Sequence, residues 1–336
     1  MDTRIAEAPG RLTLAGVPEG ADALLLADMA RAEGGPVLHL ARDASRMAAT
    51  LDALQFFAPD VVALAFPSWD CLPYDRVSPS PEIAATRLAT LAHLATGKRA
   101  PTVVVASVNA FLQRVPVPET VAGSTLALAA GNVIATDDLM GFFARNGYGR
   151  VGTVRAPGDF AVRGGIVDLW PAGLEEPIRL DFFGDTLETI RTFDADSQKT
   201  TGQVKRLMLA PASEVQLTED TIRRFRREYV SLFGAVTGGD PLYEAVSAGQ
   251  RHQGMEHWLP LFHAEMGTLA DHVPGAPVTL DFQAAEARDE RIRDYRDYYD
   301  ARAAYDTGKG GIPAYRPVPP ERLYLDADEW EAVLAD

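Results

Sequence analysis

The chain has 336 residues, which is enough for two or three domains with cores of their own. Hydrophobic residues make up 47% and charged residues 24%, values typical of a soluble globular protein. Cys71 is the only cysteine, which excludes an intrachain disulfide, and no apolar run approaches the ~20 residues of a membrane span. Residues 1–10 lack the features of a secretory signal, so we expect a cytoplasmic protein without membrane contact.

The formal net charge is −15 at pH 7, whereas nucleic-acid binding depends mainly on basic side chains that neutralise phosphates. The most basic run, RRFRR at residues 223–227, lies in a predicted helix close to Glu219, Asp220 and Glu228. We interpret this run as a solvated helix face, with a nucleic-acid contact as the less favoured alternative. Little or no direct binding of nucleic acid is therefore expected.

The first third of the chain alternates short apolar strands with helices. Strands are predicted at residues 12–15, 36–41, 61–66 and 102–106, and helices end near residue 31 and cover 44–57 and 81–94. The runs VVALAF and TVVVA are continuously apolar, which favours parallel strands buried on both faces. Residues 1–118 are therefore predicted to form a parallel α/β domain.

After about residue 116, glycines and short alternating strands replace this pattern. A helix at 137–145 precedes predicted strands at 150–155, 159–163, 166–170, 178–183 and 187–193, which turn residues separate. Residues 119–211 are thus predicted to be a small, mostly antiparallel α+β domain inserted into the parallel one.

Helices return in residues 212–336. They are predicted at 218–233 and 284–305, with a strand at 278–282 between them. The Gly/Pro-rich stretch 308–320 is typical of a linker. Because the chain then stops after a short acidic segment, we expect its end to be a boundary within a longer protein.

The first strand, turn and helix form the place where an α/β nucleotide-binding fold would hold phosphate. The P-loop pattern G-x-x-x-x-G-K-[ST] can be aligned with residues 16–23 (GVPEGADA), and only Gly16 fits it. Ala21 replaces the second glycine, Asp22 the phosphate-binding lysine, and Ala23 the hydroxyl that ligates Mg²⁺. Because a carboxylate at this position repels phosphate, we expect a degenerate P-loop without bound nucleotide.

No other pattern indicates a catalytic or metal site. The six histidines lack the H-E-x-x-H or paired-cysteine spacing of a zinc site, and Cys71 has no nucleophile signature around it. Asp181 and Asp185 could in principle act as acid and base, but turn and surface roles are favoured for both. We expect no cofactor, no metal and no enzymatic activity in this segment.

Three segments carry a family resemblance, and together they thread nearly the whole chain in family order. Residues 69–83 (WDCLPYDRVSPSPEI), continuing to Arg87 and Leu88, resemble the W-x-x-L-P-Y-D…S-P…I…R-L stretch of the bacterial transcription-repair coupling factors (Mfd). Residues 158–168 (GDFAVRGGIVD) and 179–185 (RLDFFGD) resemble a block that Mfd shares with the excision-repair protein UvrB. Residues 254–262 (GMEHWLPLF) are similar to a further Mfd element.

The resemblance implies three UvrB-like parts: domain 1a at 1–118, domain 2 at 119–211, and domain 1b with a linker at 212–336. UvrB itself has an intact P-loop and a long aromatic hairpin that clamps DNA. This sequence lacks the P-loop, and too few residues separate Phe66 from Glu82 for that hairpin, so Mfd is favoured.

The function that this resemblance implies is recruitment of the excision-repair protein UvrA. The rest of such a protein would add an RNA-polymerase-binding domain and an ATP-driven DNA translocase. One alternative is a UvrB-like damaged-DNA binder or an ATP-dependent helicase fragment. Another is a module that packs mainly against the remainder of its own chain and masks the UvrA-binding surface.

The strand predicted at 178–183 (IRLDFF) gives the docking role a physical basis. Its side chains alternate between two faces, so Arg179, Asp181 and Phe183 share the face opposite the core. Aromatic residues and arginine dominate the energetics of protein interfaces. The resemblance assigns UvrA contacts to Arg163, Arg179 and Phe183, and Arg179→Glu is expected to weaken binding while the fold stays intact. The alternative is that both arginines are ordinary surface residues paired with Asp181 or Asp159.

Overall fold

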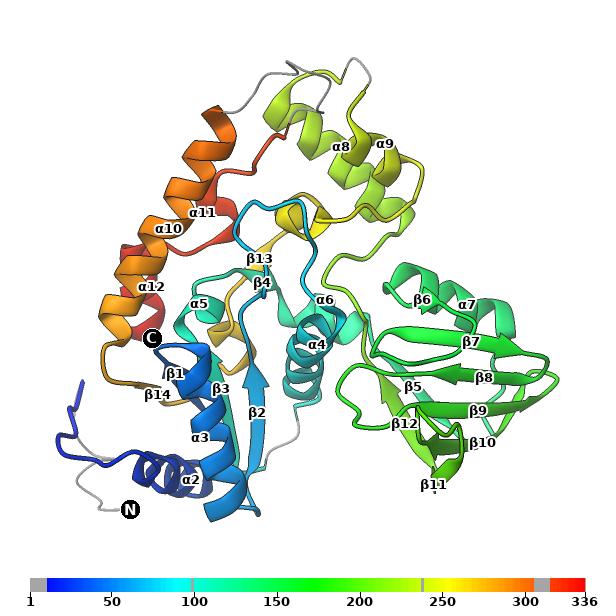
Figure 1. Cartoon of the computed structure of the whole chain (residues 1–336), viewed down its shortest axis with the longest axis horizontal. Coiled ribbons are helices and arrows are strands. Elements are labelled where there is room, and N and C mark those ends of the chain that lie inside the picture. Colours follow the sequence, from blue (N-terminus) through cyan, green and yellow to red (C-terminus); the bar gives the residue numbers. More distant parts are fainter. Residues whose placement is uncertain (1–10, 98–99, 237–238, 305–314, 336) are drawn as a thin grey trace.

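The computed structural model describes residues 11–97, 100–236, 239–304 and 315–335. It is a mixed α/β structure with one parallel sheet and several antiparallel ones. Figure 1 shows the parallel sheet beside the long helix α10 and the largest antiparallel sheet on the opposite side of the molecule.

The parallel sheet has four strands in the order β14-β1-β3-β2. Its strands are β1 (Pro36–Ala41), β2 (Val62–Phe66), β3 (Thr102–Ser107) and β14 (Val278–Leu280). Every residue of β3 is buried, because this strand lies between β1 and β2 and is covered on both faces. The prediction that the continuous apolar runs form parallel strands is confirmed, but burial on both faces holds only for β3, because β2 lies at the edge of the sheet and is partly exposed.

Helices cover both faces of this sheet. Helices α2 (Ala21–Glu33) and α3 (Ala44–Phe57) share one core with Val103 and Val105 of β3. Helix α4 (Pro81–Ala95) packs in the core on the other side, with Val104 and Ala106. Ser80 caps α4 by accepting a hydrogen bond from the backbone N–H of Ile83, and Pro81 suits the first helical position.

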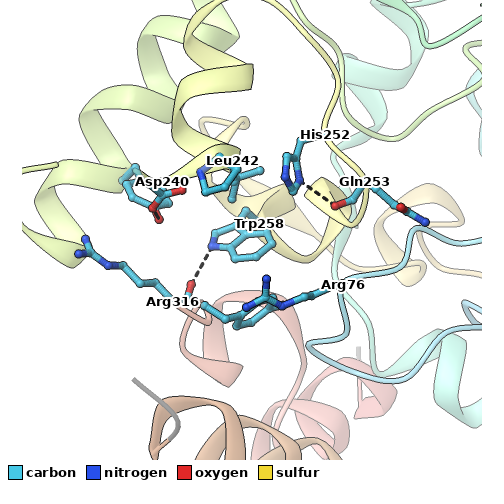
Figure 2. Close-up of a pocket in the computed structure, with 10 residues that line it drawn as sticks. Arg76, Asp240, Leu242, His252, Gln253, Trp258 and Arg316 are labelled. Atoms are coloured by element: carbon cyan, nitrogen blue, oxygen red, sulfur yellow. Dashed lines mark hydrogen bonds between the residues drawn. The ribbon is translucent and has the colours of Figure 1, made fainter. Parts of the chain in front are cut away.

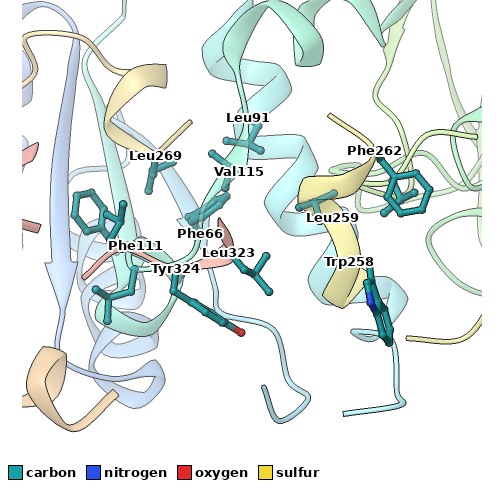
Figure 3. Close-up of a cluster of buried hydrophobic side chains, with 14 of the residues drawn as sticks. Phe66, Leu91, Phe111, Val115, Trp258, Leu259, Phe262, Leu269, Leu323 and Tyr324 are labelled. Atoms are coloured by element: carbon teal, nitrogen blue, oxygen red, sulfur yellow. The ribbon is translucent and has the colours of Figure 1, made fainter. Parts of the chain in front are cut away.

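The C-terminal part of the chain completes the larger core, in which segments far apart in the sequence meet (Figure 3). Within it Phe111 and Trp330 lie edge to face with ring centroids 5.0 Å apart, and Tyr295 stacks on Tyr324 at 4.6 Å. The remaining elements around this core are α5 (Val108–Phe111), β4 (Val115–Pro116), α6 (Pro118–Gly123), α8 (Glu219–Phe233), α9 (Pro241–Ser247), η1 (Met255–Leu261), β13 (Met266–Gly267), η2 (Ala270–His272), α10 (Ala284–Ala304), α11 (Pro320–Leu323) and α12 (Ala327–Ala335).

The largest antiparallel sheet has six strands in the order β11-β10-β9-β8-β7-β6. The short β6 runs parallel to β7, and the other neighbours are antiparallel. Helix α7 (Thr136–Arg145) and the two-stranded ribbon of β5 (Leu126–Ala129) and β12 (Arg206–Leu209) share the core on one face of this sheet. The strands of the sheet are β6 (Gly149–Arg150), β7 (Asp159–Arg163), β8 (Ile166–Leu169), β9 (Ile178–Phe183), β10 (Thr186–Phe193) and β11 (Thr200–Val204).

The six-stranded sheet lies, in the sequence, between two parts of the parallel sheet, because β14 returns to pair with β1. A buried ion pair joins the two parts of the chain where the chain leaves the antiparallel region. Arg87 of α4 is fully buried, and its Nε donates to Glu214 Oε1 at 2.6 Å. Glu214 follows β12, so the segment that leaves the antiparallel region is anchored on the parallel one.

Three sequence-based expectations are wrong in part. Residues 12–15 form no strand and are exposed, with Leu12 at 49%, so the apolar run has no sheet partner. Of the strand expected at 150–155, only Arg150 belongs to a strand, the short β6 (Gly149–Arg150). Within the expected linker, Tyr315 and Val318 are buried in the large core rather than solvated, and 308–314 lie outside the described residues.

Candidate docking surface

The six-stranded sheet has one face on its core and one facing away from helix α7. Ile178 and Leu180 of β9 are buried in the core, so the residues between them point the other way, as the alternation predicts. We call the second face the outward face. The strand register arranges its side chains in rows across β7, β8, β9 and β10. The first row is Ala161, Asp168, Arg179 and Arg191, and the second is Arg163, Ile166, Asp181 and Thr189.

Arg179 lies in the first row and is held by a buried carboxylate. Its Nε and Nη2 donate to the two oxygens of Asp168 at 2.7 and 2.9 Å, and Asp168 is only 2% exposed. The guanidinium also lies over the ring of Phe193, 4.7 Å from its centroid. The hydrogen bond with Asp168 raises the pKa of Arg179 above its ordinary value. The side chain is therefore fixed in one geometry, in which Nε and Nη2 are used within the sheet.

The second row carries the exposed Arg163 and a separate ion pair. Arg163 Nη2 donates to the carbonyl oxygen of Gly152 at 2.8 Å. Asp181 accepts from Arg191 Nη2 at 2.6 Å and from the hydroxyl of Thr189 at 2.6 Å. The expected alternative, in which Arg163 or Arg179 pairs with Asp181, is therefore wrong, because other partners fill that carboxylate.

Asp159 is not a partner of these arginines either. Its side chain accepts from the backbone N–H groups of Arg155 and Ala156, both at 3.0 Å, and so shapes the turn before β7. Both arginines thus lie on the outward face, where Asp168 neutralises Arg179 and Arg163 donates to the uncharged oxygens of Gly152 and Thr153.

Phe183 stands at the open end of β9 with 78% of its surface exposed. Tight two-residue turns on both sides leave it uncovered. Gly164 has φ +61, and a Cβ on Gly165 would lie 2.6 Å from the carbonyl oxygen of Phe182. Gly184, with φ +58, forms the turn into β10. A large aromatic ring in water at this position is costly for a purely structural role, and it favours contact with a partner.

The aligned P-loop residues occupy a different kind of site. Gly16 has φ +75 in an exposed segment, Ala21 begins α2, and Ala23 is fully buried. The carboxylate of Asp22 accepts from the backbone N–H of Ala23 at 2.9 Å and pairs with Arg46. The helix N-terminus, where a phosphate would accept such bonds, therefore holds an internal anion.

This arrangement extends to the end of the parallel sheet. Arg46 Nε also lies 3.5 Å from an oxygen of Asp281, which follows β14, and Arg42 Nη1 lies 3.3 Å from the other oxygen. Arg46 is 7% exposed, so these pairs are largely withdrawn from solvent. Opposite charges alternate along the four side chains of Asp22, Arg46, Asp281 and Arg42.

Other residues considered for chemistry have structural surroundings. Burial and the nearby carboxylate of Asp70 raise the pKa of the Cys71 thiol to about 12, which disfavours a reactive thiolate. Among the described residues, no group of three or more histidine, cysteine, aspartate or glutamate side chains could hold a metal ion. None of the helices in the described part of the chain is long and apolar enough to cross a membrane.

The basic run on α8 is arranged as a helix face. Phe225 at its centre is fully buried, whereas Arg223 and Arg227 are exposed and pair with Asp220 and Glu228. Local acidic partners offset these charges, as expected for a solvated face.

Two cavities lie elsewhere in the molecule. A small pocket of about 50 Å³ is lined by residues including Trp258, whose indole N–H donates to the carbonyl oxygen of Arg316 at 2.8 Å (Figure 2). A larger cavity of about 250 Å³ is lined by residues including Trp69, Gly158 and Glu214. Neither of these cavities is lined by Arg163, Arg179 or Phe183, which we call the three docking residues.

The antiparallel part of the chain matches a known family model, and most of the chain matches known proteins. The model of the UvrB interaction domain family matches residues 126–215, which include α7 and the whole six-stranded sheet. The chain is 33% identical to the transcription-repair-coupling factor of Haemophilus influenzae over 94% of its length. It is also 33% identical to that of Escherichia coli over 91%, and to that of Myxococcus xanthus over 80%.

The chain spans about a quarter of the length of these relatives, namely 27%, 26% and 24% of them. The match to each of them covers most of this chain. The chain belongs to the transcription-repair-coupling factor family and contains a UvrB interaction domain.

Proposed function

We propose that this chain recruits UvrA through the outward face and so links stalled transcription to nucleotide excision repair. The observation that carries the proposal is the exposure of Phe183 on the same sheet face as two arginines, within the segment that matches the UvrB interaction domain. A sheet face with one aromatic anchor and arginine donors suits a protein partner better than a small molecule.

The three docking residues would act in different ways. Phe183 would be buried by the partner and supply apolar area, which is the largest single gain. Arg163 would offer donors to a carboxylate, since its hydrogen bonds with other described residues involve only Nη2. Arg179 would present the side of its guanidinium that Asp168 leaves open.

The parallel domain would act as a scaffold without an ATPase of its own. The internal pairing of Asp22 with Arg46, at the helix N-terminus where phosphate would bind, supports a degenerate P-loop fold with no bound nucleotide. The antiparallel domain would be an insertion into this scaffold, which the return of β14 to β1 supports. We further propose a cytoplasmic protein whose polymerase-binding and translocase activities depend on parts of the family protein outside this chain.

The test is calorimetric titration of the 336-residue chain with purified UvrA. Phe183→Ala and Arg163→Glu are expected to weaken binding at least tenfold, since each removes or reverses a central contact. Arg206→Glu is the matched control, because Arg206 is exposed on β12, away from the outward face. Equal affinity for all variants would exclude the outward face. A gel-shift assay on damaged DNA tests the alternative of a UvrB-like DNA binder, which tight binding by the chain alone would favour.

A further inference from the structure

A third row of the outward face involves a residue that lies some fifty positions earlier in the chain. Val133 forms an antiparallel bridge with Thr186 at the start of β10. Two backbone hydrogen bonds of 2.8 and 2.9 Å flank this bridge. On the other edge of β10, Thr186 pairs with Phe183 of β9. The row therefore runs Phe183, Thr186, Val133 across three adjacent segments of the sheet.

The side chains of this row point to the outward face. Leu187 follows Thr186 and is fully buried in the core, and Ile134 follows Val133 and packs against the same core. Because neighbouring residues alternate, Thr186 and Val133 face away from it. Directly opposite residues on paired strands share a face, so Phe183 projects on the same side.

Val133 and Phe183 form an exposed apolar pair. Their exposed fractions are 75% and 78%, the highest of any large apolar side chain in residues 126–215. Two strand spacings separate them, which is roughly 10 Å, with the small Thr186 between. Single exposed apolar residues are ordinary, but two at one end of a face that already carries arginines indicate a shared contact.

The charges of the face indicate the chemistry of the occupant. Arginines outnumber carboxylates in the first two rows, because Arg163, Arg179 and Arg191 face only Asp168 and Asp181. The apolar pair lies at the end of β9, beside the turn that carries the exposed Asp185, and the arginines lie further along the same face. A complementary partner would therefore have an apolar recess bordered on one side by acidic side chains.

We propose that Val133 is a second apolar anchor of the docking surface, inserted with Phe183 into one apolar recess of the partner. This inference rests on the proposed function, which names UvrA as that partner. It assigns recognition to a residue in the connection between β5 and α7, outside the strands that carry the three docking residues (Figure 1). Because Thr186 is small, the partner could approach the sheet closely between the two anchors.

The experiment measures UvrA affinity of the 336-residue chain with changes at Val133. Val133→Asp is expected to raise the Kd about tenfold and Val133→Ala about threefold, because the recess would receive a charge or lose apolar contact. Met208→Asp is the matched control. Met208 is 47% exposed and lies on β12 between the core-facing Leu207 and Leu209, so it points away from the outward face. Its Kd is expected to change less than about twofold.

Phe183→Ala separates the two hypotheses. If Phe183→Ala weakens binding and Val133→Asp behaves like Met208→Asp, the second anchor is refuted while the proposed function stands. If neither Phe183→Ala nor Arg163→Glu changes the Kd, the proposed function fails and the second anchor with it. A combined Val133→Ala/Phe183→Ala variant whose loss differs from the sum of the single losses supports insertion into one recess. Unchanged melting temperatures would exclude misfolding as the cause.

Discussion

Arg87 and Glu214 lie 127 positions apart in the sequence and form an ion pair that is almost entirely withdrawn from solvent, with a distance of 2.6 Å between Nε and Oε1. The same carboxylate oxygen accepts from the indole N–H of Trp69 at 3.3 Å, and the guanidinium lies over the ring of Phe66. One carboxylate thus ties the segment that follows β12 to helix α4 and to the loop after β2.

Removing this carboxylate charge should destabilise the fold. Glu214→Gln leaves Arg87 as a buried cation without its partner, and we expect a loss of about 3 kcal/mol in the free energy of unfolding, measured by urea denaturation. Asp220→Asn is the control, since the pair of Asp220 with Arg223 is exposed and should contribute less than about 1 kcal/mol. Equal losses for the two variants would contradict a central role for the buried pair.

Charge reversal at the two docking arginines should have different effects on stability. Arg179→Glu places a second carboxylate against the buried Asp168, so we expect a loss of about 3 kcal/mol by chemical denaturation. Arg163→Glu, at an exposed position, should change stability by no more than about 0.5 kcal/mol. The expectation that Arg179→Glu leaves the fold intact is thereby revised, and Arg163→Glu is the cleaner probe of binding. Two equally stable variants would contradict the structural role of Arg179.

Stability should fall as the pH is lowered from about 6.5 to about 4. Burial lowers the pKa of His39 and of His257 to about 4, whereas an unfolded histidine titrates near about 6.5. In this window the unfolded chain binds more protons, so protonation favours unfolding by up to about 1.4 kcal/mol per pH unit for each histidine.

The contribution of one histidine can be isolated with His257→Gln. The slope of unfolding free energy against pH should decrease by the equivalent of about one proton between pH 6 and 4.5, measured by denaturant titrations at several pH values. Subtracting the slope of the variant from that of the unmodified chain cancels the contribution of other groups, such as Glu256, whose pKa is raised by burial. Identical slopes would mean that His257 titrates normally in the folded state.

Nucleotide should leave the melting temperature unchanged. Millimolar Mg-ATP binding to the folded chain would raise it by mass action, and the pairing of Asp22 with Arg46 argues against such binding. Asp22→Lys should not create a site either, because it would set a lysine against Arg46 and supply neither the missing glycine nor the hydroxyl. A nucleotide-dependent rise for the unmodified chain would refute the degenerate P-loop.

The sequence predicted the elements whose signal is local. The strands of residues 36–41, 159–163 and 178–183 and the helix of 44–57 are confirmed, because apolar runs, alternation and turn residues act within each segment. The run at 12–15 has the same local character but no partner strand. A strand forms only when its backbone N–H and C=O groups bond to a neighbouring strand, and a short apolar run does not show whether such a neighbour is present.

For the candidate site, alternation along residues 178–183 was enough to predict that Arg179 and Phe183 turn away from the core, since the side-chain period of a strand is two. Tertiary structure alone decided their neighbours. A long connection, and not a tight turn, joins β8 to β9, so it does not set the register of the two strands. The pairing of Asp168 with Arg179 therefore depends on a register that core packing sets. The bridge of Val133 to Thr186 joins segments about fifty residues apart, and no local pattern encodes such a contact.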